Sequence, residues 1–299
     1  MYKKIVALLF CSFFSLFANT HEKNKEPSLV EKLEDIYTIK YYKLSSNHST
    51  TPYILWIATP KEEMPKSGFS AVFFLDGNAI ANDIKRDDVA YLQNKPVMVG
   101  IGYRVNARFA VDERAYDFTP KTEFTNDPLK PTRKNGGAEE FLNFITDKII
   151  PTVKREVNID GSKMALWGQS YGGLFTLYTL FTKPETFSHY IVIDPSLWWR
   201  EGEILKIEQN TTVSSKKNIT FFKSSKQNDE PPASSKNIDE NTLKKIKSTQ
   251  GFFPSDEIYR LSLRLAKVHE SVTYAEFSNE THGSLFINSI KPALFLFSK

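Results

Sequence analysis

Cysteine is nearly absent from this 299-residue chain, whose only example is Cys11. Cys11 lies inside an apolar run near the N-terminus, so the remainder of the chain has neither a disulfide nor a thiolate nucleophile. Metal sites built on cysteine are excluded for the same reason. No pair of histidines has the HExxH or HxxxH spacing that places two ligands on one helix face. We therefore expect no metal and no cofactor.

Charge of one sign is also scarce, because 39 Lys and Arg residues face 35 Asp and Glu residues for a net charge of +4. Without a dense basic block, the sequence does not predict a nucleic-acid-binding surface. The small positive net charge favours anionic ligands only slightly. A composition of 40% hydrophobic and 25% charged residues predicts a globular protein. With no internal repeat and no linker, we expect one domain over residues 19–299 and a monomer.

The N-terminus has the three parts of a secretory signal, namely Lys3 and Lys4, an apolar run over residues 5–17, and the small residue Ala18. This predicts a signal peptide over residues 1–18 and a mature chain that begins near Asn19. The alternative is an uncleaved anchor, but the run is shorter than the roughly 20 residues that span a bilayer. We expect no stable membrane insertion after cleavage.

Strand patterns alternate with amphipathic helix patterns from residue 38 onward. The predicted strands cover residues 38–44, 52–58, 71–75, 97–101, 164–167, 190–193, 219–222 and 272–277. Helices are predicted over residues 137–157 and 174–181 and from Ser255 onward. This order predicts an α/β fold, with a mainly parallel central sheet and helices on both faces. The polar stretch at 223–249 is predicted to be a surface excursion.

A G-x-S-x-G motif, Gly168-Gln169-Ser170-Tyr171-Gly172, stands between a predicted strand and a predicted helix. In this context the motif predicts a tight turn that exposes the hydroxyl of Ser170 above the sheet edge. The turn requires residues without Cβ atoms two positions away on either side. Ser170 is therefore the candidate nucleophile, and the backbone N–H of Tyr171 a candidate oxyanion donor. The second donor is expected from Gly77 or Asn78, after the strand at 71–75.

The candidate general base is His282, which follows the last predicted strand, as the order of catalytic residues in this fold requires. The acid is less well defined by the sequence. Asp229, Glu230, Asp239 and Glu240 follow the strand at 219–222, but each is also typical of a solvated surface. The alternative is a Ser-His dyad, in which a carbonyl or a neutral side chain orients the imidazole. The sequence slightly favours the dyad.

Seven segments, in order along the chain, resemble the putative-esterase branch of the α/β hydrolases. They are Phe74-Leu75-Asp76-Gly77-Asn78, Val99-Gly100-Ile101-Gly102-Tyr103, Arg114-Ala115-Tyr116-Asp117-Phe118-Thr119-Pro120, Gly136-Gly137-Ala138-Glu139-Glu140-Phe141, Trp167-Gly168-Gln169-Ser170-Tyr171-Gly172-Gly173, Pro195-Ser196-Leu197-Trp198-Trp199 and Thr281-His282-Gly283. Within that branch the chain looks most like the periplasmic trilactone esterases that open enterobactin-type siderophores. The resemblance implies an α/β-hydrolase fold, a periplasmic location, and an ester substrate that is a catecholate siderophore or its ferric complex.

The resemblance also implies residues that bind an anionic catecholate. Arg114 is expected to contact the substrate, with Arg108 or Arg104 nearby, and Trp198 and Trp199 are expected to offer ring faces to the catechols. Arg114 could instead pair internally with Asp117 or Asp112, and the tryptophans could pack against the sheet edge. Two other functions stay open: a general carboxylesterase of short acyl or sugar esters, and a siderophore-binding protein without catalysis.

Overall fold

All strands that the computed structural model describes, within residues 28–226 and 253–298, belong to one sheet of eight strands. The predicted signal peptide at residues 1–18 and most of the predicted excursion lie outside the described residues. The strands are β1 (Tyr37–Leu44), β2 (Tyr53–Pro60), β3 (Phe69–Phe74), β4 (Val97–Tyr103), β5 (Ile159–Gln169), β6 (His189–Ile193), β7 (Asn218–Ser224) and β8 (Ser271–Phe277). Each predicted strand is therefore present, with ends shifted by a few residues.

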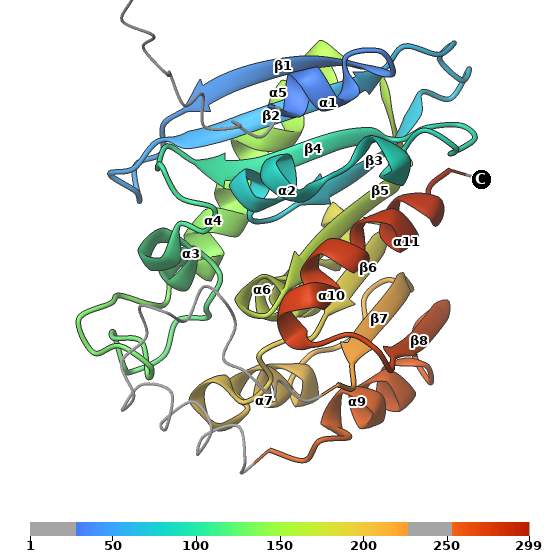
Figure 1. Ribbon diagram of the computed structural model, residues 1–299. Coiled ribbons are helices and arrows are strands. Elements are labelled where there is room, and N and C mark those ends of the chain that lie inside the picture. Colours follow the sequence, from blue (N-terminus) through green and yellow to red (C-terminus); the bar gives the residue numbers. More distant parts are fainter. Residues whose placement is uncertain (1–27, 227–252, 299) are drawn as a thin grey trace, which may run out of the picture.

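The strand order across the sheet is β1-β2-β4-β3-β5-β6-β7-β8 (Figure 1). The β1–β2 hairpin is antiparallel, and β2 pairs antiparallel with β4. Every pair from β4 to β8 is parallel. The predicted α/β fold with a mainly parallel sheet is thus confirmed. The carboxyl ends of the parallel strands share one edge of the sheet, the usual location of ligand sites in such folds.

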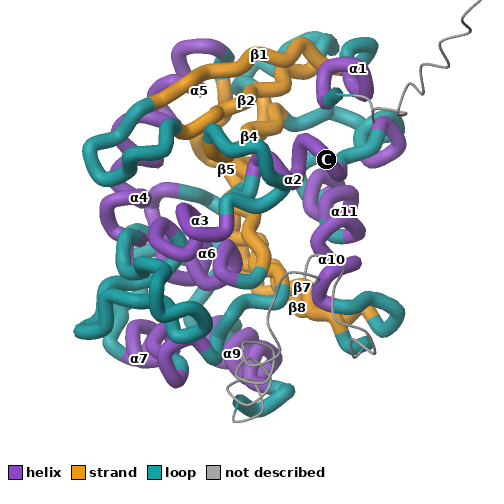
Figure 2. The backbone as a smooth tube through the Cα atoms, turned by 60° about the vertical axis from the view of Figure 1, so that its left-hand side comes forward, coloured by secondary structure: helices purple, strands orange, loops and turns teal. Residues whose placement is uncertain are grey.

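Helices cover both faces of the sheet (Figures 1 and 2). One face packs against α1 (Leu29–Leu33), α2 (Gly77–Asp83), α10 (His282–Asn288) and α11 (Ile290–Phe295). The other face packs against α3 (Val111–Asp117), α4 (Ala138–Phe144), α5 (Ile150–Glu156), α6 (Tyr171–Thr182), α7 (Glu203–Gln209) and α9 (Glu257–Leu265). Along β3, Ala71 and Phe73 face the second layer whereas Val72 and Phe74 face the first. This alternation explains why a strand buried on both faces is continuously apolar.

The helix predicted over residues 137–157 is interrupted. Between α4 and α5 a π-helical turn covers Ile145–Ile149, and Pro151 stands in the first turn of α5. Proline has no N–H to donate and its ring collides with the preceding turn, so a wider turn before Pro151 relieves the conflict. At the other end of the sheet, Lys223 and Ser224 continue β7 and pair with Glu276 and Phe277. The polar stretch therefore begins later than residue 223.

No helix within residues 28–226 and 253–298 is long and apolar enough to cross a membrane. Short 3₁₀ turns, at Arg86–Asp88, Pro184–Thr186 and Trp199–Glu201, connect the larger elements.

Candidate active site

Three residues other than glycine have a left-handed backbone within two residues of the ends of neighbouring strands. Asp76 follows β3 with φ 53°, Ser170 follows β5 with φ 59°, and Asp194 follows β6 with φ 36°. Such conformations cost free energy in residues with a Cβ atom and cluster at functional sites. Because β3, β5 and β6 are adjacent, the three residues lie side by side along the carboxyl edge of the sheet.

Ser170 forms the sharp turn between β5 and α6, with φ 59° and ψ −117°. A Cβ atom at Gly168 would lie 2.3 Å from the carbonyl oxygen of Gly172, so only glycine fits there. At Gly172 the nearest atom would be 3.6 Å away, which is ordinary contact. The prediction that both flanking glycines are sterically required is right for Gly168 and wrong for Gly172. The tight approach on the helix side is at Gly173, where a Cβ would lie 2.9 Å from the Ile193 carbonyl oxygen.

The hydroxyl of Ser170 is half-buried, and its Oγ lies 3.2 Å from the Oγ of Ser196. Ser196 also donates its backbone N–H to the Ser170 carbonyl at 3.1 Å. Sequence reasoning treated Ser196 only as part of a family segment. Because it contacts the candidate nucleophile through both backbone and side chain, it fixes the segment after β6 against the elbow.

His282 is the first residue of α10 rather than part of a loop, and Thr281 caps the helix by accepting from the Ser284 N–H. The Nε2 of Gln169 donates to the His282 carbonyl oxygen at 2.5 Å. Since Gln169 immediately precedes Ser170, this bond brings the two candidate catalytic segments together. The imidazole is 46% exposed. Within the described residues no hydrogen bond joins it to Ser170 Oγ.

Sequence reasoning missed the carboxylate that lies beside His282. Asp194 Oδ2 lies 3.4 Å from His282 Nδ1 and accepts a hydrogen bond from Ser224 Oγ at 2.6 Å. Its other oxygen accepts from the Ser224 backbone N–H at 3.0 Å. A carboxylate at Nδ1 favours the tautomer whose Nε2 can accept a proton. The sequence feature that could have indicated Asp194 is its position: it directly follows β6, the strand next to β5, which leads to Ser170.

The carboxylates considered from sequence, Asp229, Glu230, Asp239 and Glu240, lie outside the described residues. They remain predictions. The carboxylate that the structure places beside His282 is instead Asp194, directly after β6.

Both segments predicted to bind an oxyanion begin helices at the same edge. Tyr171 opens α6, so its backbone N–H has no partner within the helix. Gly77 and Asn78 are the first residues of α2. Just before them the Leu75 N–H donates to the Trp167 carbonyl oxygen at 3.1 Å, which links the ends of β3 and β5. The Asn78 side chain instead clamps β4: it donates to Tyr103 O at 2.9 Å and accepts from Tyr103 N at 2.8 Å.

Arg114 forms a bidentate ion pair with Asp76, with Nε–Oδ1 and Nη2–Oδ2 distances of 2.7 and 2.8 Å. The internal partners expected from sequence, Asp117 and Asp112, are therefore wrong. Asp76 is buried and the Arg114 side chain is only 15% exposed. Because Asp76 neutralises it, Arg114 is a weak candidate for binding an anion and ties the end of β3 to the elbow instead.

The other candidate substrate contacts differ in exposure. Trp199 is fully buried, so the expectation that its face meets a catechol is wrong in this conformation. Trp198 is half-buried, with its ring centroid 6.0 Å from that of Tyr171. Arg108 pairs with Asp83, and its guanidinium lies over the Phe109 ring at 4.6 Å. Arg104 is exposed after β4.

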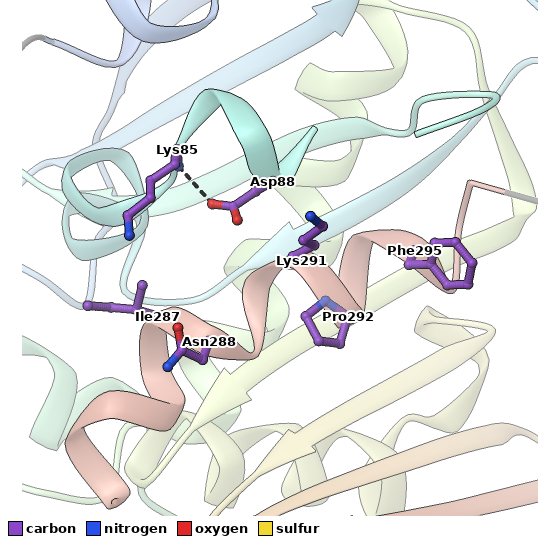
Figure 3. A pocket seen from close by; sticks show the side chains of 7 residues that line it. All are labelled: Lys85, Asp88, Ile287, Asn288, Lys291, Pro292 and Phe295. Carbon is purple, nitrogen blue, oxygen red and sulfur yellow. Dashed lines mark hydrogen bonds between the residues drawn. The ribbon is translucent and has the colours of Figure 1, made fainter. Parts of the chain in front are cut away.

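Two surface pockets lie beside α2 and beside α10 and α11, and of these only the first borders this region. One of about 400 Å³ is lined by Gly77, Asn78 and Arg108, among others, and so borders the predicted oxyanion loop. The other, of about 420 Å³, lies between the 3₁₀ turn at Arg86–Asp88 and the last two helices (Figure 3). Its lining residues are Lys85, Asp88, Ile287, Asn288, Lys291, Pro292 and Phe295. None belongs to the strand ends that carry Ser170 and Asp194. In the described part of the chain, no three His, Cys, Asp or Glu residues form a group suited to a metal ion.

This sheet edge has the features of a hydrolase-type site: an elbow serine, a histidine beside a carboxylate, and two helix N-termini. The chain belongs to the family described as "Putative esterase", which it matches over residues 46–268. It is 33% identical over 194 residues to the apo-salmochelin esterase of Escherichia coli O6:H1, covering 63% of this chain and 60% of that protein. To the ferri-bacillibactin esterase BesA of Bacillus subtilis it is 32% identical over 187 residues, covering 58% and 64%. The alignments thus span less than two thirds of these relatives.

A solved structure described as the enterobactin and salmochelin hydrolase IroE superposes with a TM-score of 0.66 at 27% identity, covering 88% of this chain and 96% of that one. The predicted resemblance to siderophore esterases of the α/β-hydrolase type is therefore confirmed at the level of family and fold.

Proposed function

We propose that this protein is a serine esterase that hydrolyses the ester bonds of a catecholate trilactone siderophore. One observation carries the proposal: the strained serine elbow stands at the same sheet edge as His282 and its carboxylate neighbour Asp194. The relatives named for siderophore ester cleavage support the substrate class. The slight positive balance of the chain agrees with an anionic substrate.

The proposed reaction is acyl transfer to water. His282 Nε2 takes the proton of Ser170 as the hydroxyl attacks a lactone carbonyl carbon, and the carbonyl oxygen becomes an oxyanion. The backbone N–H of Tyr171, with that of Gly77 or Asn78, stabilises the oxyanion. Collapse of the intermediate expels the alcohol, which receives the proton from His282. Water then hydrolyses the acyl-serine with His282 as base, and Asp194 stabilises the imidazolium in both steps.

In this proposal Ser170, His282 and Asp194 form a catalytic triad, in place of the Ser-His dyad that the sequence slightly favoured. Its carboxylate is held by two hydrogen bonds from Ser224, so its orientation is set by β7 before substrate arrives. A fixed carboxylate needs little reorganisation during the reaction, which is the condition for effective electrostatic stabilisation.

The proposal is tested with Ser170→Ala. We expect this variant to lose ester cleavage, by at least about a thousandfold in kcat, while still binding the trilactone. Ser162→Ala is the matched control, because Ser162 lies near the opposite end of the same strand. Mass spectrometry of enterobactin and of its ferric complex after incubation reports the products. Cleavage by Ser170→Ala at the wild-type rate would refute the nucleophile.

The substrate class has its own test. Rates on enterobactin and on p-nitrophenyl butyrate separate a trilactone esterase from a general carboxylesterase. Labelling of Ser170 by a fluorophosphonate separates either enzyme from a binding protein, since an inert scaffold has no activated hydroxyl. We also propose export to the periplasm through the leader at residues 1–18. Cell fractionation and the N-terminal sequence of the mature protein test that step.

A further inference from the structure

Arg200 combines three features that the proposed mechanism does not use. Its backbone is left-handed, with φ 49° and ψ 49°, inside the 3₁₀ turn Trp199–Glu201. Glu201 and the capping residue Gly202 follow with φ 55° and φ 81°, so three successive residues have positive φ angles. Two of these residues carry Cβ atoms, and a conformation that costs free energy at both positions is typical of a functional segment.

The guanidinium of Arg200 has unused capacity for an anion. Its Nη2 donates to the Asn126 carbonyl, and its Cζ lies 4.6 Å from the centroid of the Phe124 ring. The Nε is buried, and no described group accepts its hydrogen. In the described part of the chain no carboxylate pairs with Arg200, in contrast to Arg108, Arg114 and Arg133. A guanidinium with an unsatisfied buried donor and no counter-ion favours an anionic ligand.

Arg200 is tied to the candidate nucleophile from two directions. Along the chain, Trp199 donates its N–H to the carbonyl of Ser196, the residue whose hydroxyl contacts Ser170. Across the fold, the loop after α3 binds Arg200 through Asn126 and binds the Tyr171 hydroxyl through Asp127 at 3.0 Å. Consecutive loop residues thus hold Arg200 and the Tyr171 side chain, so one loop connects Arg200 to the residue that follows Ser170.

Aromatic surface accompanies this charge. Phe124 is 54% exposed although Arg200 lies against its ring. Trp198 is half-buried beside Tyr171. A cation next to ring faces suits a ligand that is both aromatic and anionic, because the guanidinium binds the charged oxygens while the rings contact the ligand's ring.

We propose that Arg200, together with Phe124 and Trp198, forms a subsite for an anionic aromatic arm of the substrate. This inference rests on the proposed esterase function and adds a residue that determines specificity. The subsite takes over the role expected of Arg114, whose charge is neutralised, and of Trp199, which is buried.

The test compares two esters in the full mature chain. For Arg200→Gln we expect KM for enterobactin to rise on the order of tenfold, with kcat changed less than about twofold. Hydrolysis of the uncharged p-nitrophenyl butyrate should be unchanged, which a merely structural role would not predict. Arg200→Lys should recover part of the affinity, because it restores the charge without the planar group.

The control is Arg155→Gln, which removes the same charge from the last turn of α5, at the opposite edge of the sheet. It should leave both substrates unaffected. Equal losses on both esters for Arg200→Gln, or an unchanged KM for enterobactin, would overturn the subsite.

A binding measurement separates this inference from the proposed function. Calorimetry with Ser170→Ala and with Ser170→Ala/Arg200→Gln reports enterobactin affinity in the absence of cleavage. We expect a loss on the order of tenfold in the double variant. If wild-type protein fails to cleave enterobactin but this loss is seen, the esterase proposal fails and the subsite stands. Equal affinities in the two variants refute the subsite whatever the cleavage result.

Discussion

The carboxylate of Asp194 lies 3.4 Å from Nδ1 of His282, and the two residues reach this position from different layers of the fold. Asp194 directly follows β6 of the sheet, whereas His282 begins α10, which packs on one face. The left-handed backbone of Asp194, with φ 36°, turns the chain at this point. In the proposed triad, this pairing would supply the orienting carboxylate that the sequence left undecided.

Replacing Asp194 with asparagine should lower kcat about a hundredfold to ten-thousandfold, because the amide neither stabilises the imidazolium nor favours the required tautomer. KM should change little. Steady-state kinetics on p-nitrophenyl butyrate measures the effect, and thermal unfolding shows whether the variant is folded. Asp147→Asn, at an exposed helical position, is the matched control. A folded Asp194→Asn variant with wild-type kcat would leave a dyad as the mechanism.

The two glycines of the elbow motif should respond differently to alanine. Gly168→Ala places a Cβ 2.3 Å from a backbone oxygen, so we expect a loss of a few kcal/mol in the free energy of unfolding. Gly172→Ala meets no atom nearer than 3.6 Å and lies in the first turn of α6. It should change stability by less than about 1 kcal/mol. Urea unfolding of both variants measures the difference, and equal losses would contradict the steric account.

The ion pair between Arg114 and Asp76 should contribute mainly to stability. Arg114→Gln leaves a buried carboxylate without its partner, which typically costs about 3–5 kcal/mol. Asp76→Asn/Arg114→Gln should cost less than the sum of the two single changes, because neither variant group is then an uncompensated charge. A double-mutant cycle by urea unfolding measures the coupling. Additive effects, together with a raised KM for enterobactin in Arg114→Gln, would instead indicate direct substrate binding.

A buried carboxyl should make stability depend on pH. Burial raises the pKa of Asp117 from its ordinary 3.8 to about 7, although the hydroxyls of Tyr53 and Tyr103 donate to the carboxylate. The folded state therefore retains a proton that the unfolded state has released between about pH 4 and pH 7. The stabilising contribution is complete below pH 4 and is lost as the pH rises through 7.

Urea unfolding at several pH values tests this linkage against Asp117→Asn, which cannot titrate. Between pH 4 and pH 8 the wild-type free energy of unfolding should fall relative to that of the variant by roughly 4 kcal/mol, from three pKa units at about 1.4 kcal/mol each. Parallel pH profiles for the two proteins would show that Asp117 is ionised in the folded state throughout this range.

Much of the fold was predictable because its signals are local. A strand segment buried on both faces has to be apolar, as β4 and residues 71–74 of β3 are, and the apolar positions of an amphipathic helix have to recur with each turn. The π-helical turn before Pro151 was less predictable. A proline within a helix indicates an irregularity but does not specify which irregular geometry the helix adopts. The short helices α2, α3 and α7 also had no distinct pattern, because so few turns leave little periodicity.

The candidate site divides in the same way. Ser170 and His282 were predicted from short segments with a known relation to strand ends, and their catalytic roles remain predictions. Asp194 and Arg200 were missed for different reasons: the position of Asp194 directly after β6 is a weak signal, and nothing in the immediate neighbours of Arg200 marks it. Their significance lies in contacts with His282 and with Phe124, which come from distant parts of the chain.

By itself the sequence determined the parallel α/β architecture, the strand-turn-helix around Ser170 and the family, because each depends on backbone and packing preferences over a few neighbouring residues. Only the tertiary structure decided which charges meet: Asp76 with Arg114, Asp194 with His282, and Arg200 with a ring and a carbonyl. Side-chain partners across a sheet edge are fixed by strand order and by the path of the connecting loops. Electrostatic interactions fall with distance in space rather than with separation along the chain.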